Sequence, residues 1–290
     1  MLTKEQFHKR IAGGLRFLDG ATGSNLRKAG MPNDACTEEW VLAHPDILVC
    51  LQRQYAQAGA QILYAPTFQA QPIALERVCL DKQTEAINAQ LVALSRSAAP
   101  DTLIAGDLTT LAAFTESWDP QNFDLLVENY RRQIRGLIDG GADLLVAETL
   151  MYPQEAEAIL TAAELEQAGA VMYSFTMMPD GSLYSGMEAG PVLRELEQAG
   201  AAAVGFNCVA ADMMTPYLVS ALRRYVHGPL LCKPNAGVPV INENGIADYP
   251  MAPEEFTQIM RHCAKNGATL LGGCCGTDPG FLSVLTANIL

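Results

Sequence analysis

Three cysteines stand where their thiols could hold a metal ion. Cys274 and Cys275 are adjacent within Gly272-Gly-Cys-Cys-Gly276, and Cys208 ends an earlier apolar segment. Adjacent cysteines do not readily bridge each other, because the peptide between them would be strained, whereas the flanking glycines let both sulfurs point at one centre. Three thiolates with no histidine nearby in sequence suit a tetrahedral zinc with its fourth position open. The alternative is that all three are buried small apolar residues, as free cysteines often are.

A zinc site of this kind would favour chemistry on a thiol. An ion that already carries three thiolates is poor at making hydroxide, but it can hold a fourth thiol and remove its proton at neutral pH. Alkylation of a thiol is therefore favoured over hydrolysis. Asp19 and Glu148 would then hold a cationic amino group of the substrate, because an ammonium reconciles two neighbouring carboxylates. Alternatively, these carboxylates cap helices or make buried hydrogen bonds.

The elements that must position these residues form a repeating pattern. An amphipathic helix, then Gly-Ala, then a short apolar strand recurs with Gly-Ala at 59–60, 141–142, 169–170, 200–201 and 267–268. Glycine just past a helix end supplies the left-handed residue that turns the chain into the strand. Some predicted strands have no Gly-Ala pair before them. Counting these as well, the sequence predicts eight strands, at about 15–19, 60–66, 102–107, 143–148, 170–176, 202–207, 229–234 and 269–273.

Two of the helices are well marked. Apolar residues recur at helical spacing over 123–138, with charged residues on the other face. Pro45 stands where a first-turn proline belongs, and apolar residues follow it on one side. Continuous apolar strands alternating with such helices indicate a parallel sheet, and eight units in roughly 250 residues predict a (β/α)8 TIM barrel. We expect a single domain over 1–290; an open doubly wound sheet is the main alternative.

The polar residues gather at the predicted strand ends. On such a barrel the residues at the carboxyl ends of the strands face the active site. Three cysteines and three carboxylates are therefore expected to meet there, within the positions Asp19-Gly20-Ala21, Thr67, Asp107, Glu148, Asn207-Cys208, Asn235 and Cys274-Cys275.

Composition excludes several classes of partner. The 290 residues carry 19 Lys plus Arg against 32 Asp plus Glu, a formal net charge of −13, which repels nucleic acid and anionic lipid. No secretory signal pattern opens the chain and no uncharged apolar run reaches the roughly 18 to 20 residues of a membrane span, so we expect a cytoplasmic protein with no membrane partner. The eight cysteines are expected to be thiols, and the other five to be structural.

Four motifs make the chain resemble a known family. They are Asp19-Gly-Ala-Thr-Gly23, Gly205-Phe-Asn-Cys208, Pro234-Asn-Ala-Gly237 and Gly272-Gly-Cys-Cys-Gly276. In this order and spacing they resemble the homocysteine-binding domain of the zinc-dependent homocysteine S-methyltransferases, over nearly the whole chain. The segment 59–76 and the Glu148-Thr149 region are most similar to the homocysteine module of cobalamin-dependent methionine synthase.

The resemblance implies a set of roles. Zinc would be held by Cys208, Cys274 and Cys275, with Asn235 approaching the metal when substrate is absent, and homocysteine sulfur would be the exchangeable ligand. Asp19 and Glu148 would bind the substrate's amino group, in a pocket to which Gly20, Ala21, Thr67 and Asn207 also belong. The expected reaction is methyl transfer to the homocysteine thiolate, forming methionine.

The methyl donor is the open point. The synthase carries folate and cobalamin modules in its chain and this sequence ends at Leu290, so the sequence is either a free-standing enzyme or a fragment. We expect methylcobalamin on a separate corrinoid protein. The segments Tyr64-Ala-Pro66 and Asp107-Leu-Thr-Thr110 depart from the synthase pattern, and we expect them at the rim, on the donor side. Alternatives are S-methylmethionine, S-adenosylmethionine or betaine as donor, a non-catalytic thiol- or zinc-binding partner of a corrinoid protein, and a zinc-free aldolase-like barrel.

Overall fold

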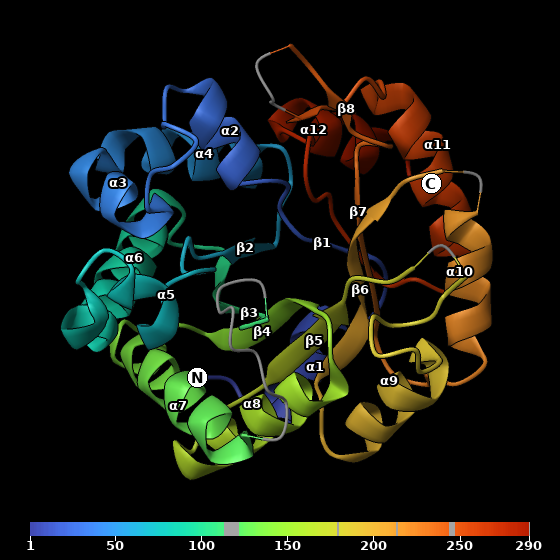
Figure 1. The fold of residues 1–290 in the computed structure, drawn as a ribbon. Coiled ribbons are helices and arrows are strands. Elements are labelled where there is room, and N and C mark those ends of the chain that lie inside the picture. Colours follow the sequence, from blue (N-terminus) through green and yellow to red (C-terminus); the bar gives the residue numbers. More distant parts are fainter. Residues whose placement is uncertain (113–121, 179, 213, 244–246, 290) are drawn as a thin grey trace.

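The eight predicted strands form one parallel sheet that closes on itself (Figure 1). A parallel bridge joins Leu18 to Ile62, and the Asp19 N–H donates to the Ile62 carbonyl at 3.2 Å, so the two edge strands of the sheet meet. The (β/α)8 barrel is thus confirmed and the open sheet excluded. In sheet order the strands are β1 (Arg16–Phe17), β10 (Leu270–Leu271), β7 (Leu230–Asn235), β6 (Ala203–Ala210), β5 (Val171–Phe175), β4 (Leu144–Leu150), β3 (Leu103–Thr109) and β2 (Ile62–Tyr64).

Helices form a ring around the barrel in this computed structural model, which describes residues 1–112, 122–178, 180–212, 214–243 and 247–289 (Figure 1). The predicted helix over 123–138 is observed as Phe123–Asp139, and Pro45 opens the first turn of its helix. The helices are α1 (Lys4–Ile11), α2 (Gly23–Lys28), α3 (Thr37–Ala43), α4 (Pro45–Gln57), α5 (Pro72–Glu76), the 3-10 helix η1 (Asp81–Gln83), α6 (Thr84–Ala98), α7 (Phe123–Asp139), α8 (Pro153–Leu165), α9 (Ala189–Gln198), α10 (Thr215–Arg223), α11 (Pro253–Lys265) and α12 (Pro279–Asn288).

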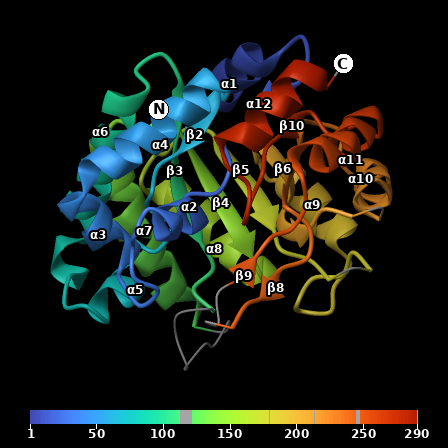
Figure 2. The same ribbon diagram turned by 90° about the horizontal axis from the view of Figure 1, so that it is seen from above.

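A short hairpin that the sequence did not predict follows β7. Its strands, β8 (Val240–Ile241) and β9 (Ala247–Asp248), pair antiparallel. Figure 2 shows this hairpin at one end of the molecule and α1 at the other. None of the helices in the described ranges has the length and apolar character needed to cross a membrane.

Apolar side chains fill the barrel below its polar end. One buried cluster lies inside the ring of strands and includes Leu18, Ile62, Leu144, Val146, Met172, Leu231 and Leu270. Phe7 of α1 is fully buried in the same cluster and closes the amino-terminal end of the barrel. The barrel is therefore a packed core with chemistry confined to its carboxyl end.

The alternation of side chains along the strands sets which residues face inward. Val146 and Leu231 belong to the inner cluster, so Glu148 and Lys233, two residues further on, also face the interior. Gly106 faces outward, because a Cβ added there would lie 2.9 Å from the Leu137 side chain of α7. Its neighbour Asp107 consequently points into the barrel.

Candidate functional site

The three cysteines predicted from sequence come together at the carboxyl end of the barrel. Cys208 lies on β6, and Cys274 and Cys275 follow β10. Their sulfurs all lie within 4.8 Å of one another, with 4.0 Å between those of Cys208 and Cys275. Asn235 holds the loop, since its side-chain Oδ1 accepts a hydrogen bond from the Cys275 N–H at 3.0 Å. The arrangement offers three converging sulfur ligands.

Cys208 of this cluster and Thr149 on β4 have unusual backbone conformations. Cys208 and Thr149 both have a φ of 58°, in the left-handed region that residues other than glycine rarely adopt. Each lies where the strand register shifts, between Asn207 and Ala210 on β6 and between Ala147 and Leu150 on β4. Local strain of this kind persists where the surrounding fold imposes it, and it is concentrated at functional sites.

Tyr249 is part of the cysteine cluster, although sequence reasoning missed it. It packs over Gly276, where an added Cβ would lie only 2.2 Å from the tyrosine Cγ. Hydrogen bonds from Cys208, then Cys274, and from Tyr249 lower the pKa of Cys275 to about 3. The cluster therefore favours the thiolate form of Cys275.

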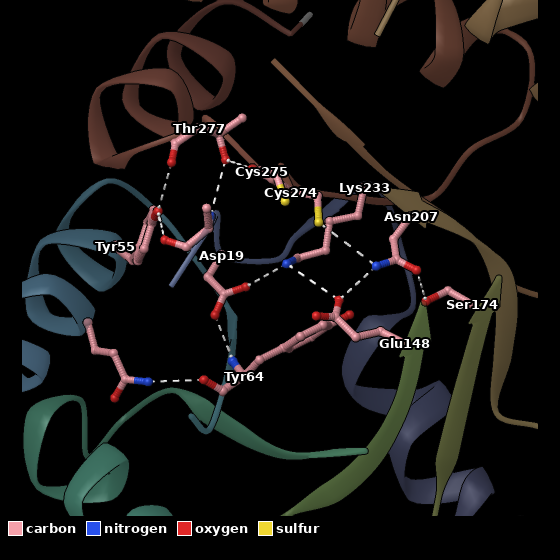
Figure 3. Close-up of polar contacts among 12 residues, drawn as sticks. Asp19, Tyr55, Tyr64, Glu148, Ser174, Asn207, Lys233, Cys274, Cys275 and Thr277 are labelled. Carbon is pink, nitrogen blue, oxygen red and sulfur yellow. Dashed lines mark hydrogen bonds and ion pairs between the residues drawn. The ribbon is translucent and has the colours of Figure 1, made fainter. Parts of the chain in front are cut away.

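A buried lysine lies between the carboxylates that were expected to bind an ammonium (Figure 3). The Nζ of Lys233 is 3.4 Å from Oδ1 of Asp19 and 3.8 Å from Oε2 of Glu148, and it lies 4.5 Å from the centre of the Tyr64 ring. Sequence reasoning missed Lys233, although a charge at an inward-facing position two residues after Leu231 was a usable signal.

The ionisable side chains of this pocket perturb one another. Burial raises the pKa of Asp19, raises that of Glu148 to about 8, and raises that of Asp107 well above its ordinary value. Burial by itself lowers the pKa of Lys233, but the charges of Glu148 and Asp19 outweigh it and the lysine pKa rises. The pocket thus combines a stable ammonium with carboxyls that resist ionisation.

Tyr64 and Asp107 are not at the rim, and the expectation that they lie there was wrong. Tyr64 is 2% exposed and Asp107 is 4% exposed. Both are inward-facing strand residues, on β2 and on β3, which runs on to Thr109. These two departures from the synthase pattern therefore lie among the buried residues around Lys233.

Asn207 links the carboxylates to the strained backbone. Its side-chain oxygen accepts hydrogen bonds from the Thr149 N–H at 2.7 Å and the Ser174 hydroxyl at 2.9 Å. Its amide donates to the Thr149 hydroxyl at 2.7 Å. The amide also donates to Oε2 of Glu148 at 3.2 Å (Figure 3). Asn207 therefore fixes the position of Glu148.

The remaining predicted residues lie around the same pocket. A Cβ added to Gly20 would lie 2.6 Å from the Tyr55 hydroxyl, which donates to the Ala21 carbonyl at 2.9 Å. The Thr67 hydroxyl donates to the Asp107 carbonyl at 2.9 Å and accepts from the Asp107 N–H at 3.0 Å. The side chain of Thr67 is thus engaged with the backbone of β3, beside the pocket.

Comparison with curated proteins finds relatives with a longer chain. The sequence is 27% identical to the methionine synthases of Mycobacterium leprae (strain TN) and Mycobacterium tuberculosis (strain ATCC 25618 / H37Rv). Each match covers 93% of this chain but 24% of the relative, so the chain spans about a quarter of their length.

Comparison with solved structures finds a match in size as well as fold. The homocysteine methyltransferase MmuM from Escherichia coli, in its oxidised form, has a TM-score of 0.81 and 26% identity over 95% of this chain and 96% of that one. Its metallated form has the same TM-score at 25% identity, over 96% and 98%.

The family model described as homocysteine S-methyltransferase matches residues 16–289. That span begins at β1 and contains every residue of the cysteine cluster and the carboxylate pocket. The chain belongs to the homocysteine S-methyltransferase family.

Proposed function

We propose that this chain transfers a methyl group to the thiol of homocysteine, forming methionine, with zinc held by Cys208, Cys274 and Cys275. The observation that carries the proposal is the convergence of these three sulfurs at the mouth of the barrel. Zinc–sulfur bonds of about 2.3 Å at tetrahedral angles separate two sulfurs by about 3.8 Å. The 4.0 Å between the sulfurs of Cys208 and Cys275 fits that geometry.

The chain's own residues would bind and orient the substrate. The carboxylate pocket that contains Asp19 and Glu148 would receive the ammonium of homocysteine, beside Asn207. Gly20, Ala21 and Thr67 would shape the wall next to it. Because Asp19, Glu148 and Asn207 are all at most 8% exposed, their charges and dipoles act in a medium of low dielectric, where they hold a ligand more strongly than in water.

Positioning and nucleophile activation would supply the catalysis. When bound, zinc would act as a Lewis acid that lowers the pKa of a thiol reaching its fourth position. The substrate thiol would give up its proton to solvent, and its sulfur would form a bond to the methyl carbon as the bond from that carbon to the donor breaks, with the electron pair of that bond staying on the donor. Fixing the amino group of homocysteine in the pocket sets the direction from which its sulfur attacks.

For the donor, we propose methylcobalamin carried by a separate corrinoid protein. Support comes from exposed apolar side chains on the connections after β5, β6 and β7, three adjacent strands, and in the first turn of α10 (Thr215–Arg223). Exposed apolar clusters mark interaction surfaces on soluble proteins. This apolar rim consists of Met178, Tyr184, Met187, Met214, Tyr217, Val238, Val240 and Ile241, which are between 43% and 69% exposed.

The function is tested by supplying zinc-loaded protein and homocysteine with four donors in parallel. We expect methionine from methylcobalamin. Rapid methionine formation from S-methylmethionine, S-adenosylmethionine or betaine, with none from methylcobalamin, would reject the corrinoid donor. It would still support homocysteine as the methyl acceptor. Stoichiometric zinc with no methionine from any of the four would favour a non-catalytic binding partner.

A further inference from the structure

Tyr249 is an aromatic residue that the fold places against the loop of Cys274 and Cys275. It directly follows β9 and is half-buried. Its side chain lies over the backbone of Gly276, where an added Cβ would be 2.4 Å from the tyrosine Cβ and 2.7 Å from its Cδ2. Gly276 also has a φ of 83°, in the left-handed region that favours glycine. Position 276 therefore needs a glycine for two reasons, and one of them is Tyr249.

The hydroxyl of Tyr249 reaches the sulfurs of the cluster. It makes a side-chain hydrogen bond with Cys275, and the charges of Cys275, Cys208 and Cys274 all act on it. A phenol is protonated at neutral pH, so towards a thiolate it is the donor. Tyr249 is thus a hydrogen-bond donor to the cluster that is not itself a cysteine.

The backbone of Cys275 is held by the end of β7. Its N–H donates to Oδ1 of Asn235 at 3.0 Å, and its carbonyl accepts from the Ala236 N–H at 2.9 Å. With both main-chain groups engaged, rotation about the Cα–Cβ bond is the main freedom left to the Cys275 sulfur. A hydrogen bond from Tyr249 to that sulfur restricts this rotation.

The β8–β9 hairpin brings Tyr249 back to the cluster. The chain leaves the cluster at Asn235, and the two strands of the hairpin pair antiparallel before it returns at Tyr249. At the base of the hairpin, a Cβ added to Gly237 would lie 3.3 Å from Cε of Met251. The two ends of this excursion therefore lie side by side, next to Cys275.

We propose that Tyr249 is a positioning residue of the metal site, whose hydroxyl donates a hydrogen bond to the sulfur of Cys275. The inference rests on the proposed function, because it takes Cys275 to be a zinc ligand. A hydrogen bond to a coordinating side chain orients it and tunes the metal. Three thiolates already outnumber the two positive charges of a zinc ion, and a substrate thiolate would add a fourth. A donor at Cys275 offsets part of that negative charge.

The test measures metal binding, which needs no methyl donor. Tyr249→Phe keeps the ring over Gly276 and removes only the hydroxyl. We expect it to weaken zinc binding about ten-fold, as loss of a partner of a metal ligand does, in competition with a chromophoric chelator. With Co²⁺ as the probe, the sulfur-to-cobalt charge-transfer absorption should move to longer wavelength, because a sulfur without its hydrogen bond gives up an electron more readily. The control Tyr225→Phe, whose ring packs against Gly190 of α9, should change neither measurement.

A second variant separates the hydroxyl from the ring. Tyr249→Leu loses both and should bind zinc at least as weakly as Tyr249→Phe. If Tyr249→Phe matches the parent in zinc affinity and in cobalt absorption, this inference alone is overturned, even where Tyr249→Leu binds weakly, because the ring would then act only by packing. A parent protein that binds neither zinc nor Co²⁺ would instead overturn the zinc site of the proposed function.

Discussion

The ammonium of Lys233 on β7 lies 3.4 Å from the carboxylate of Asp19, which follows β1, with β10 between the two strands. Both side chains are almost completely buried, at 4% and 2% exposed. Desolvating two charges offsets much of their attraction, so such a pair adds little net stability. Removing one partner, however, leaves the other charge buried and uncompensated.

Lys233→Met is therefore expected to lower the free energy of unfolding by about 3–5 kcal/mol, measured by urea denaturation. The double variant Lys233→Met with Asp19→Asn should recover a substantial part of that loss, because no uncompensated charge remains at Asp19. A double variant as unstable as the sum of the two single variants would show that the pair does not act as a unit.

Cys208→Ala should lose most of the bound zinc while the barrel stays folded, because the core below the site does not depend on this side chain. Elemental analysis gives the metal content, and far-UV circular dichroism checks the fold. Cys50→Ala, at an exposed cysteine of α4, is the matched control and should keep the metal. Stoichiometric zinc in Cys208→Ala would remove this residue from the ligand set.

The pH dependence of stability should reveal Glu148. Burial raises its pKa in the folded protein to about 8, whereas an unfolded chain ionises glutamate near pH 4.3. Between these values the folded state binds more protons than the unfolded state, so the free energy of unfolding falls as pH rises.

Glu148→Gln removes this contribution, so its stability relative to the parent should improve between about pH 5 and about pH 8, as followed by urea denaturation at each pH. Glu157→Gln, at an exposed position of α8, should follow the parent at every pH. Parallel curves for Glu148→Gln and the parent would contradict the raised pKa.

Asn207→Ala removes four hydrogen bonds that join β4, β5 and β6 at the site. It leaves the Thr149 N–H, which donates to Asn207 at 2.7 Å, without its partner. We expect a loss of at least about 1–3 kcal/mol, the penalty for one unsatisfied buried group, in thermal or urea unfolding. A change below about 0.5 kcal/mol would show that another group takes over these bonds.

The architecture of this protein could be predicted from its sequence, because the architecture depends on local sequence patterns. Glycine-alanine turns after amphipathic helices and short apolar strands recur often enough to specify eight units, and a parallel sheet of eight such units closes. The cysteine cluster was predictable for the same reason, since Cys208 and Cys274-Cys275 follow predicted strands and the fold brings strand ends together.

The charge arrangement was decided by tertiary structure. Whether Lys233, Asp107 and Tyr64 face the interior depends on strand register and on how far β2 and β3 extend, and a shift of one residue would point each to the other face. The pairing of Lys233 with Asp19 joins residues more than 200 positions apart, on strands that lie near each other because β1 and β7 both pair with β10. The sequence by itself indicated which chemistry the carboxyl end of the barrel can perform, and only the tertiary structure placed Lys233 between Asp19 and Glu148.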